Sequence, residues 1–84
     1  MRPKLGNLKA RDVIHALEKG GFYIHETSGS HLQLKHPSKP GRITVPCHGR
    51  FDLPKHIVKS IIRQAGLSNK EFFDLIMRVE VKIN

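Results

Sequence analysis

Apolar side chains recur at helical spacing within residues 8–19. The four positions are Ala10, Val13, Ile14 and Leu17. Separations of three or four residues place side chains on one face of an α-helix. Gly20 and Gly21 follow, and glycine readily adopts the left-handed conformation in which many helices end. The pattern therefore predicts a first helix over residues 8–19, after a frayed lead-in of residues 1–7.

Three short segments in the middle of the chain are typical of β-strands, because they alternate or are rich in β-forming side chains. They cover residues 22–27, 31–36 and 42–45. Ser28, Gly29 and Ser30 form a turn signal between the first two. Residues 37–41, which include two prolines, predict a rigid connection before the third strand. Pro46 is expected to end that strand because it has no N–H for the ladder.

Two more helices are predicted in the last third of the chain. Pro54 suits the first turn of a helix, and Asp52 is its candidate N-cap. Apolar side chains continue at helical spacing up to Gly66, namely Ile57, Val58, Ile61, Ile62 and Ala65. Ser68 and Glu71 have the spacing of a capping box, which starts a third helix.

The third helix is expected to bury some of its apolar side chains. The pattern does not decide the structure of the tail that follows. The apolar side chains of the helix are Phe72, Phe73, Leu75, Ile76 and Val79. Residues 79–83 alternate, so a short strand and disorder both stay open for the tail.

This order of elements predicts an α+β fold over residues 1–84 as one domain. Short connections between three consecutive strands imply an antiparallel sheet, and the helices then cover one of its faces. A chain of 84 residues has only a modest core, so an enclosed cofactor pocket is not expected. Any chemistry is expected on an open surface.

Positive charge narrows the classes of partner. The chain has 15 Lys and Arg against seven Asp and Glu, a formal net charge of +8. Such an excess favours a polyanion, because bound cations release the counterions of phosphates. Nucleic acid is the first candidate and an acidic protein the second. Charge alone does not exclude a basic protein that is simply soluble.

The expected cellular compartment follows from three kinds of sequence feature that are missing. One cysteine, Cys47, leaves no internal disulfide framework. The sequence has no apolar run long enough for a transmembrane helix, and its first residues lack the apolar stretch of a signal peptide. We therefore expect a cytoplasmic protein without a membrane partner.

Strand alternation predicts which side chains leave the core. Inward positions are Phe22, Ile24, Leu32, Leu34, Ile43 and Val45. The solvent face then holds Tyr23, His25, His31, Gln33, Lys35, Arg42 and Thr44. These side chains are cationic or neutral, a set suited to phosphate and ribose contacts. An ordinary solvated face would also be polar, but usually of mixed charge.

His31 starts the second strand directly after Gly29 and Ser30. Glycine permits a tight turn and the serine hydroxyl can hydrogen-bond within it. The unperturbed pKa of histidine suits proton transfer near neutrality. RNA cleavage without a metal needs a base for the ribose 2′-OH and positive charge beside the phosphorane. Lys35 or Arg42 is a candidate for that charge, although the pattern alone does not separate a catalytic histidine from a surface one.

The other metal-ligating and nucleophilic side chains have plainer interpretations. His31 and His36 are five residues apart and fall on opposite faces of a strand, and one cysteine is too few for structural zinc sets. No metal site is therefore predicted. A packing role fits His36 at least as well as catalysis. Cys47 is expected to be an inert thiol, and His48 is a candidate phosphate contact.

Motifs spread along most of the chain resemble the HicA toxins. They are Gly-Gly-Phe at 20–22, Gly-Ser-His at 29–31, His-Pro at 36–37, Ile-Thr-Val-Pro at 43–46 with His48, Asp-Leu-Pro-Lys at 52–55, and residues 61–67, which end in Gln-Ala-Gly-Leu. The resemblance covers about residues 8–75. The family often has glycine where this chain has His56, and the apolar tail lies outside the pattern.

The resemblance implies a fold similar to a double-stranded-RNA-binding domain. It also implies an endoribonuclease that cleaves mRNA and inhibits translation, with His31 as the catalytic residue and no metal or organic cofactor. A HicB-type antitoxin is implied as the partner that binds the toxin and covers its active site. The RNA-binding residues expected on this basis are Ser30, Gln33, Lys35, Arg42 and His48.

A non-catalytic RNA-binding module of the same fold is the alternative function, because a basic face serves both. Only His31 after Gly29 and Ser30 separates the two, since a pure binder needs no titrating imidazole there. A helix-turn-helix DNA-binding protein is disfavoured because strands separate the first two helices.

Overall fold

A computed structural model describes residues 8–47 and 52–81 of the chain. Its elements are, in order, α1 (Ala10–Lys19), β1 (Tyr23–Ser28), β2 (His31–His36), β3 (Lys39–Pro46), α2 (Lys55–Ala65) and α3 (Asn69–Val81). The three strands form one antiparallel sheet in the order β1-β2-β3. This α-β-β-β-α-α arrangement confirms the predicted α+β fold.

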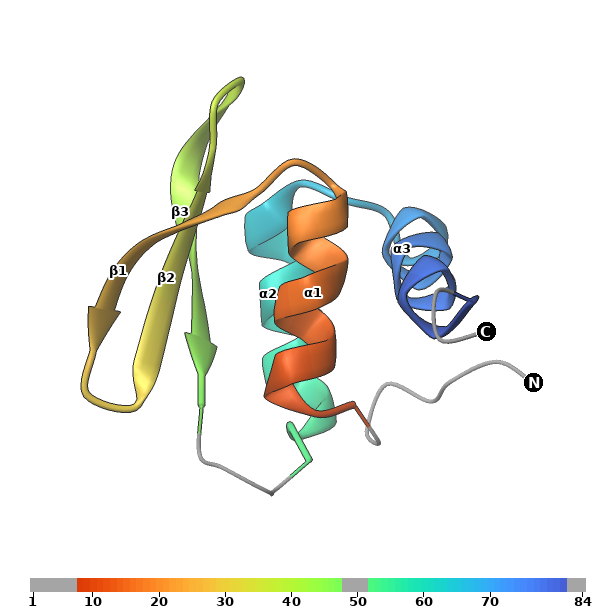
Figure 1. The fold of residues 1–84 in the computed structure, drawn as a ribbon, viewed down its shortest axis with the longest axis horizontal. Coiled ribbons are helices and arrows are strands. Elements are labelled where there is room, and N and C mark those ends of the chain that lie inside the picture. Colours follow the sequence, from red (N-terminus) through yellow and green to blue (C-terminus); the bar gives the residue numbers. More distant parts are fainter. Residues whose placement is uncertain (1–7, 48–51, 82–84) are drawn as a thin grey trace.

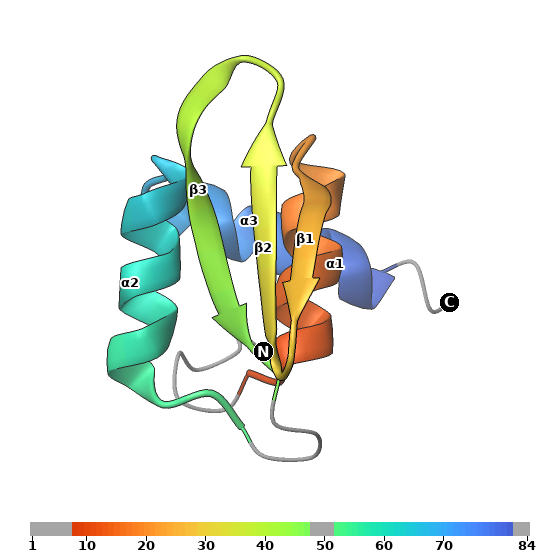
Figure 2. The same cartoon turned by 90° about the vertical axis from the view of Figure 1, so that its left-hand side faces the viewer.

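All three helices lie on the same side of the sheet, as Figures 1 and 2 show. The layer next to the strands consists of α1 and α2, and α2 lies beside β3 at one edge (Figure 2). α3 lies beyond α1, on the side away from the strands (Figure 1). No described helix covers the other face of the sheet, which we call the open face.

The hydrophobic core fills the space between the sheet and the layer of α1 and α2, and it continues between α1 and α3. The sheet contributes Leu34, Ile43 and Val45, and α3 contributes Phe72. The helix positions predicted from spacing make up much of the rest: Ala10, Val13, Ile14, Leu17, Val58, Ile61, Ile62 and Ala65. None of the helices within residues 8–47 and 52–81 has the length and apolar character needed to cross a bilayer.

β1 departs from simple alternation. Its pairing with β2 shifts between Ile24 and Glu26, so that His25 has no partner in β2. Ile24 pairs with Leu34 and therefore faces the helices, because directly opposite residues of an antiparallel pair share a face. Ile24 is nevertheless 45% exposed, since β1 is an edge strand. Ile24 therefore has the inward direction that alternation predicts, but it does not join the buried core.

β3 is longer than predicted. It begins at Lys39, so the turn before it is confined to residues 37–38 and the predicted rigid connection over residues 37–41 is wrong. Pro40 is tolerated because an edge strand needs no ladder donor on its outer side. Gly41, with φ +81°, supplies a backbone conformation that side chains disfavour. Pro46 is the last residue of the strand rather than the residue after it.

The starts of α1 and α2 are joined by a short pairing. Lys9 and Asp52 form an antiparallel bridge, and Lys9 Nζ lies 3.3 Å from Asp52 Oδ1. Leu53 donates its N–H to the Leu8 carbonyl at 2.7 Å. α1 therefore begins after Lys9, two residues later than predicted. The predicted N-cap role of Asp52 is also wrong, because Pro54 precedes α2 and no side chain caps it.

α2 ends and α3 begins as predicted. Gly66 closes α2 in the left-handed conformation, with φ 70°. Glu71 donates its N–H to Ser68 Oγ at 3.1 Å, and Glu71 Oε1 accepts the Ser68 N–H at 2.8 Å. The hydrogen bond from the Ser68 backbone is the main reason that the pKa of Glu71 lies below its ordinary value. α3 continues to Val81, so the segment that alternation left open is helical to that residue.

Candidate functional site

The first hairpin of the sheet carries Ser30 and His31 at its end. Ser28 pairs with His31, so Gly29 and Ser30 are the central residues of a two-residue turn. Gly29 has φ +59°, and no non-glycine residue in the described chain has a positive φ. A positive φ at the first central position only is that of a type II′ turn, which favours glycine there. Gly29 thus allows the chain to reverse directly into β2 at His31.

His31 is the first residue of the central strand. It pairs with Ser28 of β1 on one side and Pro46 of β3 on the other. Residues two apart along a strand share a face, so His31 lies on the open face with Gln33 and Lys35, on the side that alternation predicts. Its side chain is exposed to solvent.

The end of the sheet that carries His31 is also the end at which α1 and α2 begin (Figure 1). Cys47 donates its N–H to the carbonyl of Ser30, which ties the end of β3 to the turn. An exposed imidazole therefore lies at the end of the sheet where this turn is tied to β3.

A polar side-chain pair continues the open face from His31 along β2. Arg42 Nη1 donates a hydrogen bond to Gln33 Oε1 at 2.8 Å. Thr44, rather than Arg42, is the backbone partner of Gln33. The hydrogen bond therefore runs diagonally between the two strands and joins Arg42 to a residue that lies between His31 and Lys35.

Distance along β2 limits which cations act beside His31. Lys35 is four residues further on, so its Cα lies about 13 Å from that of His31. Gln33, which holds Arg42, is about half as far along the strand. Of the two candidates for charge stabilisation at His31, the geometry favours Arg42. Lys35 is placed for the next part of an extended polyanion.

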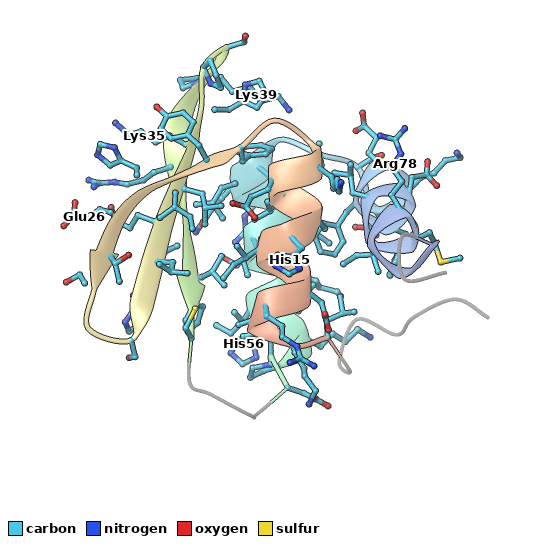
Figure 3. All side chains as sticks on the ribbon, in the orientation of Figure 1. His15, Glu26, Lys35, Lys39, His56 and Arg78 are labelled. Carbon is cyan, nitrogen blue, oxygen red and sulfur yellow. The ribbon has the colours of Figure 1, made fainter. Side chains whose placement is uncertain are left out.

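The open face also carries an acid, contrary to the predicted set of cationic and neutral side chains. The register shift in β1 pairs Glu26 with Gln33. Figure 3 shows Glu26 and Lys35 on the side of the sheet turned away from the helices. Strict alternation from Phe22 would have placed Glu26 inward, and the extra residue in the bulge reverses that assignment.

The structure brings together most of the residues predicted to contact RNA. Ser30 lies in the turn before His31, and Gln33, Lys35 and Arg42 lie along the open face. His48 lies outside the described residues.

The remaining histidine and thiol candidates have structural surroundings. The His36 ring is 4.8 Å from the Phe22 ring, edge to face, and His36 Nδ1 accepts the Ser38 N–H at 3.0 Å. His36 therefore packs against Phe22, which agrees with the packing role that the sequence left open beside catalysis. Burial raises the pKa of the Cys47 thiol, which agrees with an inert cysteine. Within the part of the chain that the structure describes, no three His, Cys, Asp and Glu side chains gather as metal ligands do.

Two polar side chains with no predicted role hold the sheet against α2. Gln64 Oε1 accepts the Thr44 N–H at 3.0 Å, which satisfies a backbone donor of edge strand β3. Lys39 Nζ donates to the Ala65 carbonyl at 3.2 Å and lies 5.6 Å from the centre of the Phe22 ring. Both contacts join segments that are distant in sequence, so no local sequence pattern predicts them.

Comparison with known proteins identifies the family of the chain. A family model described as the HicA toxin of bacterial toxin–antitoxin systems matches residues 10–67, well over half of the chain. The match includes α1, the whole sheet and α2, and it ends before α3. No curated protein matches the chain. The chain therefore belongs to the HicA toxin family of bacterial toxin–antitoxin systems.

Proposed function

We propose that this toxin is an endoribonuclease that cleaves mRNA in the cytoplasm and thereby inhibits translation. His31 is the residue that moves a proton during cleavage, and the reaction uses no metal or organic cofactor. The observation that carries the proposal is the position of His31, exposed at the start of the central strand and on a face that no described helix covers.

In the proposed reaction, a ribose 2′-oxygen attacks the adjacent phosphorus and forms a 2′,3′-cyclic phosphate. The bond between phosphorus and the 5′-oxygen breaks, and the 5′-oxygen leaves with a proton taken from solvent water. His31 takes the proton from the 2′-OH. Arg42, held by Gln33, supplies positive charge where the phosphorane becomes more negative. The neighbouring phosphates and sugars are bound by Ser30, Lys35 and His48.

A toxin of this class has an antitoxin as its partner. We propose that the antitoxin is a HicB-type protein that neutralises the toxin by covering the open face. Its binding would then exclude RNA from His31. The excess of basic side chains, +8 in formal charge, favours an acidic surface on that protein.

The direct test compares the wild type with His31→Ala and with His15→Ala, both by inducible expression in bacteria and with purified protein. His15 is an exposed histidine of α1 (Figure 3), so its replacement removes the same chemistry from the helical layer. We expect His31→Ala to slow RNA cleavage by about 10²- to 10⁴-fold. His15→Ala should cleave RNA, deplete mRNA and arrest growth like the wild type.

Two results would contradict the proposal. Equal cleavage rates for the wild type and His31→Ala would remove His31 from the mechanism. A folded wild type that binds RNA without cutting it, and leaves growth and mRNA intact, would identify the non-catalytic RNA-binding module.

A further inference from the structure

One aromatic side chain on the open face has no part in the proposed cleavage. Tyr23 begins β1, is 45% exposed and pairs with Lys35 of β2. The phenol ring and the ammonium group therefore leave the sheet on the same face, at neighbouring positions. Both lie further along the sheet than the Arg42–Gln33 hydrogen bond.

The surroundings of Tyr23 do not have the character of an apolar protein interface. Ile24, the next residue, is also 45% exposed, but it pairs with Leu34 and faces the other side of the sheet. The two exposed side chains therefore do not form one contiguous apolar patch. On its own face, Tyr23 has Lys35 beside it, with Arg42 and the acid Glu26 further along.

An aromatic ring next to cations is the arrangement with which proteins bind unpaired nucleotides. The ring stacks on a base while the cations contact the backbone phosphates. A duplex offers no free base face, because its bases stack on one another, and it is recognised through phosphates and 2′-hydroxyls. Exposure of Tyr23 thus favours a single strand over a duplex as the ligand of this face.

We propose that the open face binds single-stranded RNA, with one unpaired base stacked on Tyr23 and the adjoining phosphate at Lys35. The strand then runs along β2 to His31, a distance of about 13 Å between the Cα atoms of Lys35 and His31. The inference rests on the proposed function, because it names the form of RNA that the same face takes.

The composition of the chain provides a direct probe. Tyr23 is the single tyrosine, and the chain has no tryptophan, so tyrosine emission reports on this side chain alone. The experiment uses the full-length His31→Ala chain, which leaves the RNA uncut. A short unstructured oligoribonucleotide should quench Tyr23 emission beyond the absorption correction obtained with free tyrosine amide. The same strand annealed to its complement should not.

Affinity measurements add a matched control. Tyr23→Ala should weaken binding of the single strand by about 5- to 150-fold, the range found for loss of one base–aromatic stack. Tyr23→Phe retains a ring and should restore most of the affinity. Ile24→Ala removes an equally exposed side chain from the opposite face and should bind like the parent. Replacing successive nucleotides by abasic ones should reveal one position whose base matters to the parent but not to Tyr23→Ala.

Each opposite result has a definite meaning. Unchanged Tyr23 emission, with equal affinity for Tyr23→Ala and its parent, overturns the stacking. Quenching of Tyr23 emission by the antitoxin and not by RNA also overturns the stacking, and it assigns Tyr23 to the interface with the antitoxin. Duplex binding as tight as single-strand binding overturns the choice of ligand. None of these touches the cleavage proposal, which fails only if cleavage by the wild type is absent or independent of His31.

Discussion

At the scale of the residue, Gly21 combines a backbone conformation that favours glycine with the close approach of a side chain that is distant in sequence. Its φ is +95°, and a Cβ added there would lie 2.9 Å from His36 Nε2. The His36 ring is held in turn against Phe22. Gly21 is therefore required both for its conformation and for the space that it leaves.

We expect Gly21→Ala to lower the free energy of unfolding by about 1–2 kcal/mol for the left-handed backbone and by about 1–3 kcal/mol more for the steric contact. Gly29→Ala is the control, because Gly29 has φ +59° with no atom within 4 Å of an added Cβ. It should lose only the backbone part. Urea denaturation measures both changes. Equal losses would show that His36 moves aside at no cost.

The same scale shows why the site was only partly predictable. Residues 31–35 of β2 alternate without interruption, so the sequence pattern places His31, Gln33 and Lys35 on one face. The pattern fails for Glu26 because a bulge in β1 adds a residue, and a single extra residue moves every later side chain to the other face. The Arg42–Gln33 hydrogen bond depends on the register between strands, which local alternation does not contain.

At the scale of the element, α3 lies outside the matched family region and yet forms part of the core. The match ends at residue 67, whereas Phe72 is fully buried and Ile76 nearly so. α3 packs on α1, on the side away from the sheet (Figure 1). The helix therefore stabilises the layer that supports the sheet without approaching the open face.

We expect Phe72→Ala to lower the free energy of unfolding by about 3–5 kcal/mol, the usual cost of deleting a buried phenylalanine. A chain of this length typically has about 4–13 kcal/mol in total, so the loss is a large fraction. Phe73→Ala provides the comparison, because Phe73 is only half-buried and should cost less. Denaturant or thermal unfolding measures the loss of stability in both variants. A similar loss from both would contradict the assignment of Phe72 to the core.

At the scale of the whole molecule, positive charge is unevenly compensated. On α3, Lys70 Nζ lies 3.4 Å from Asp74 Oδ2, and at the start of α1, Lys9 is paired with Asp52. By contrast, α2 carries three cationic side chains and no acidic residue. The open face has Glu26 against Lys35 and Arg42, so the sheet side and α2 keep a positive potential that attracts polyanions.

Salt dependence distinguishes a phosphate contact from general attraction. If Lys35 contacts a phosphate of single-stranded RNA, Lys35→Gln should reduce the slope of log affinity against log salt concentration by about 0.7. Lys70→Gln removes the same charge from α3, beyond the helical layer, and should leave the slope unchanged. Titrations of RNA binding at several salt concentrations measure both. An equal reduction by the two variants would contradict a specific contact at Lys35.

Local patterns were sufficient for the order of the elements, for most of the core, for the end of α2 at Gly66 and the start of α3, and for the side of β2 on which His31 lies. Each of these follows from the period of a helix or strand, or from caps such as Ser68 with Glu71, and involves neighbours within a few residues. The exposure of Ile24, the side of Glu26, the early start of β3 and the Gln64–Thr44 contact required the tertiary structure. These features depend on which strand is at an edge, where a bulge interrupts the register and which helix lies beside β3. Such relations join residues that only folding brings together.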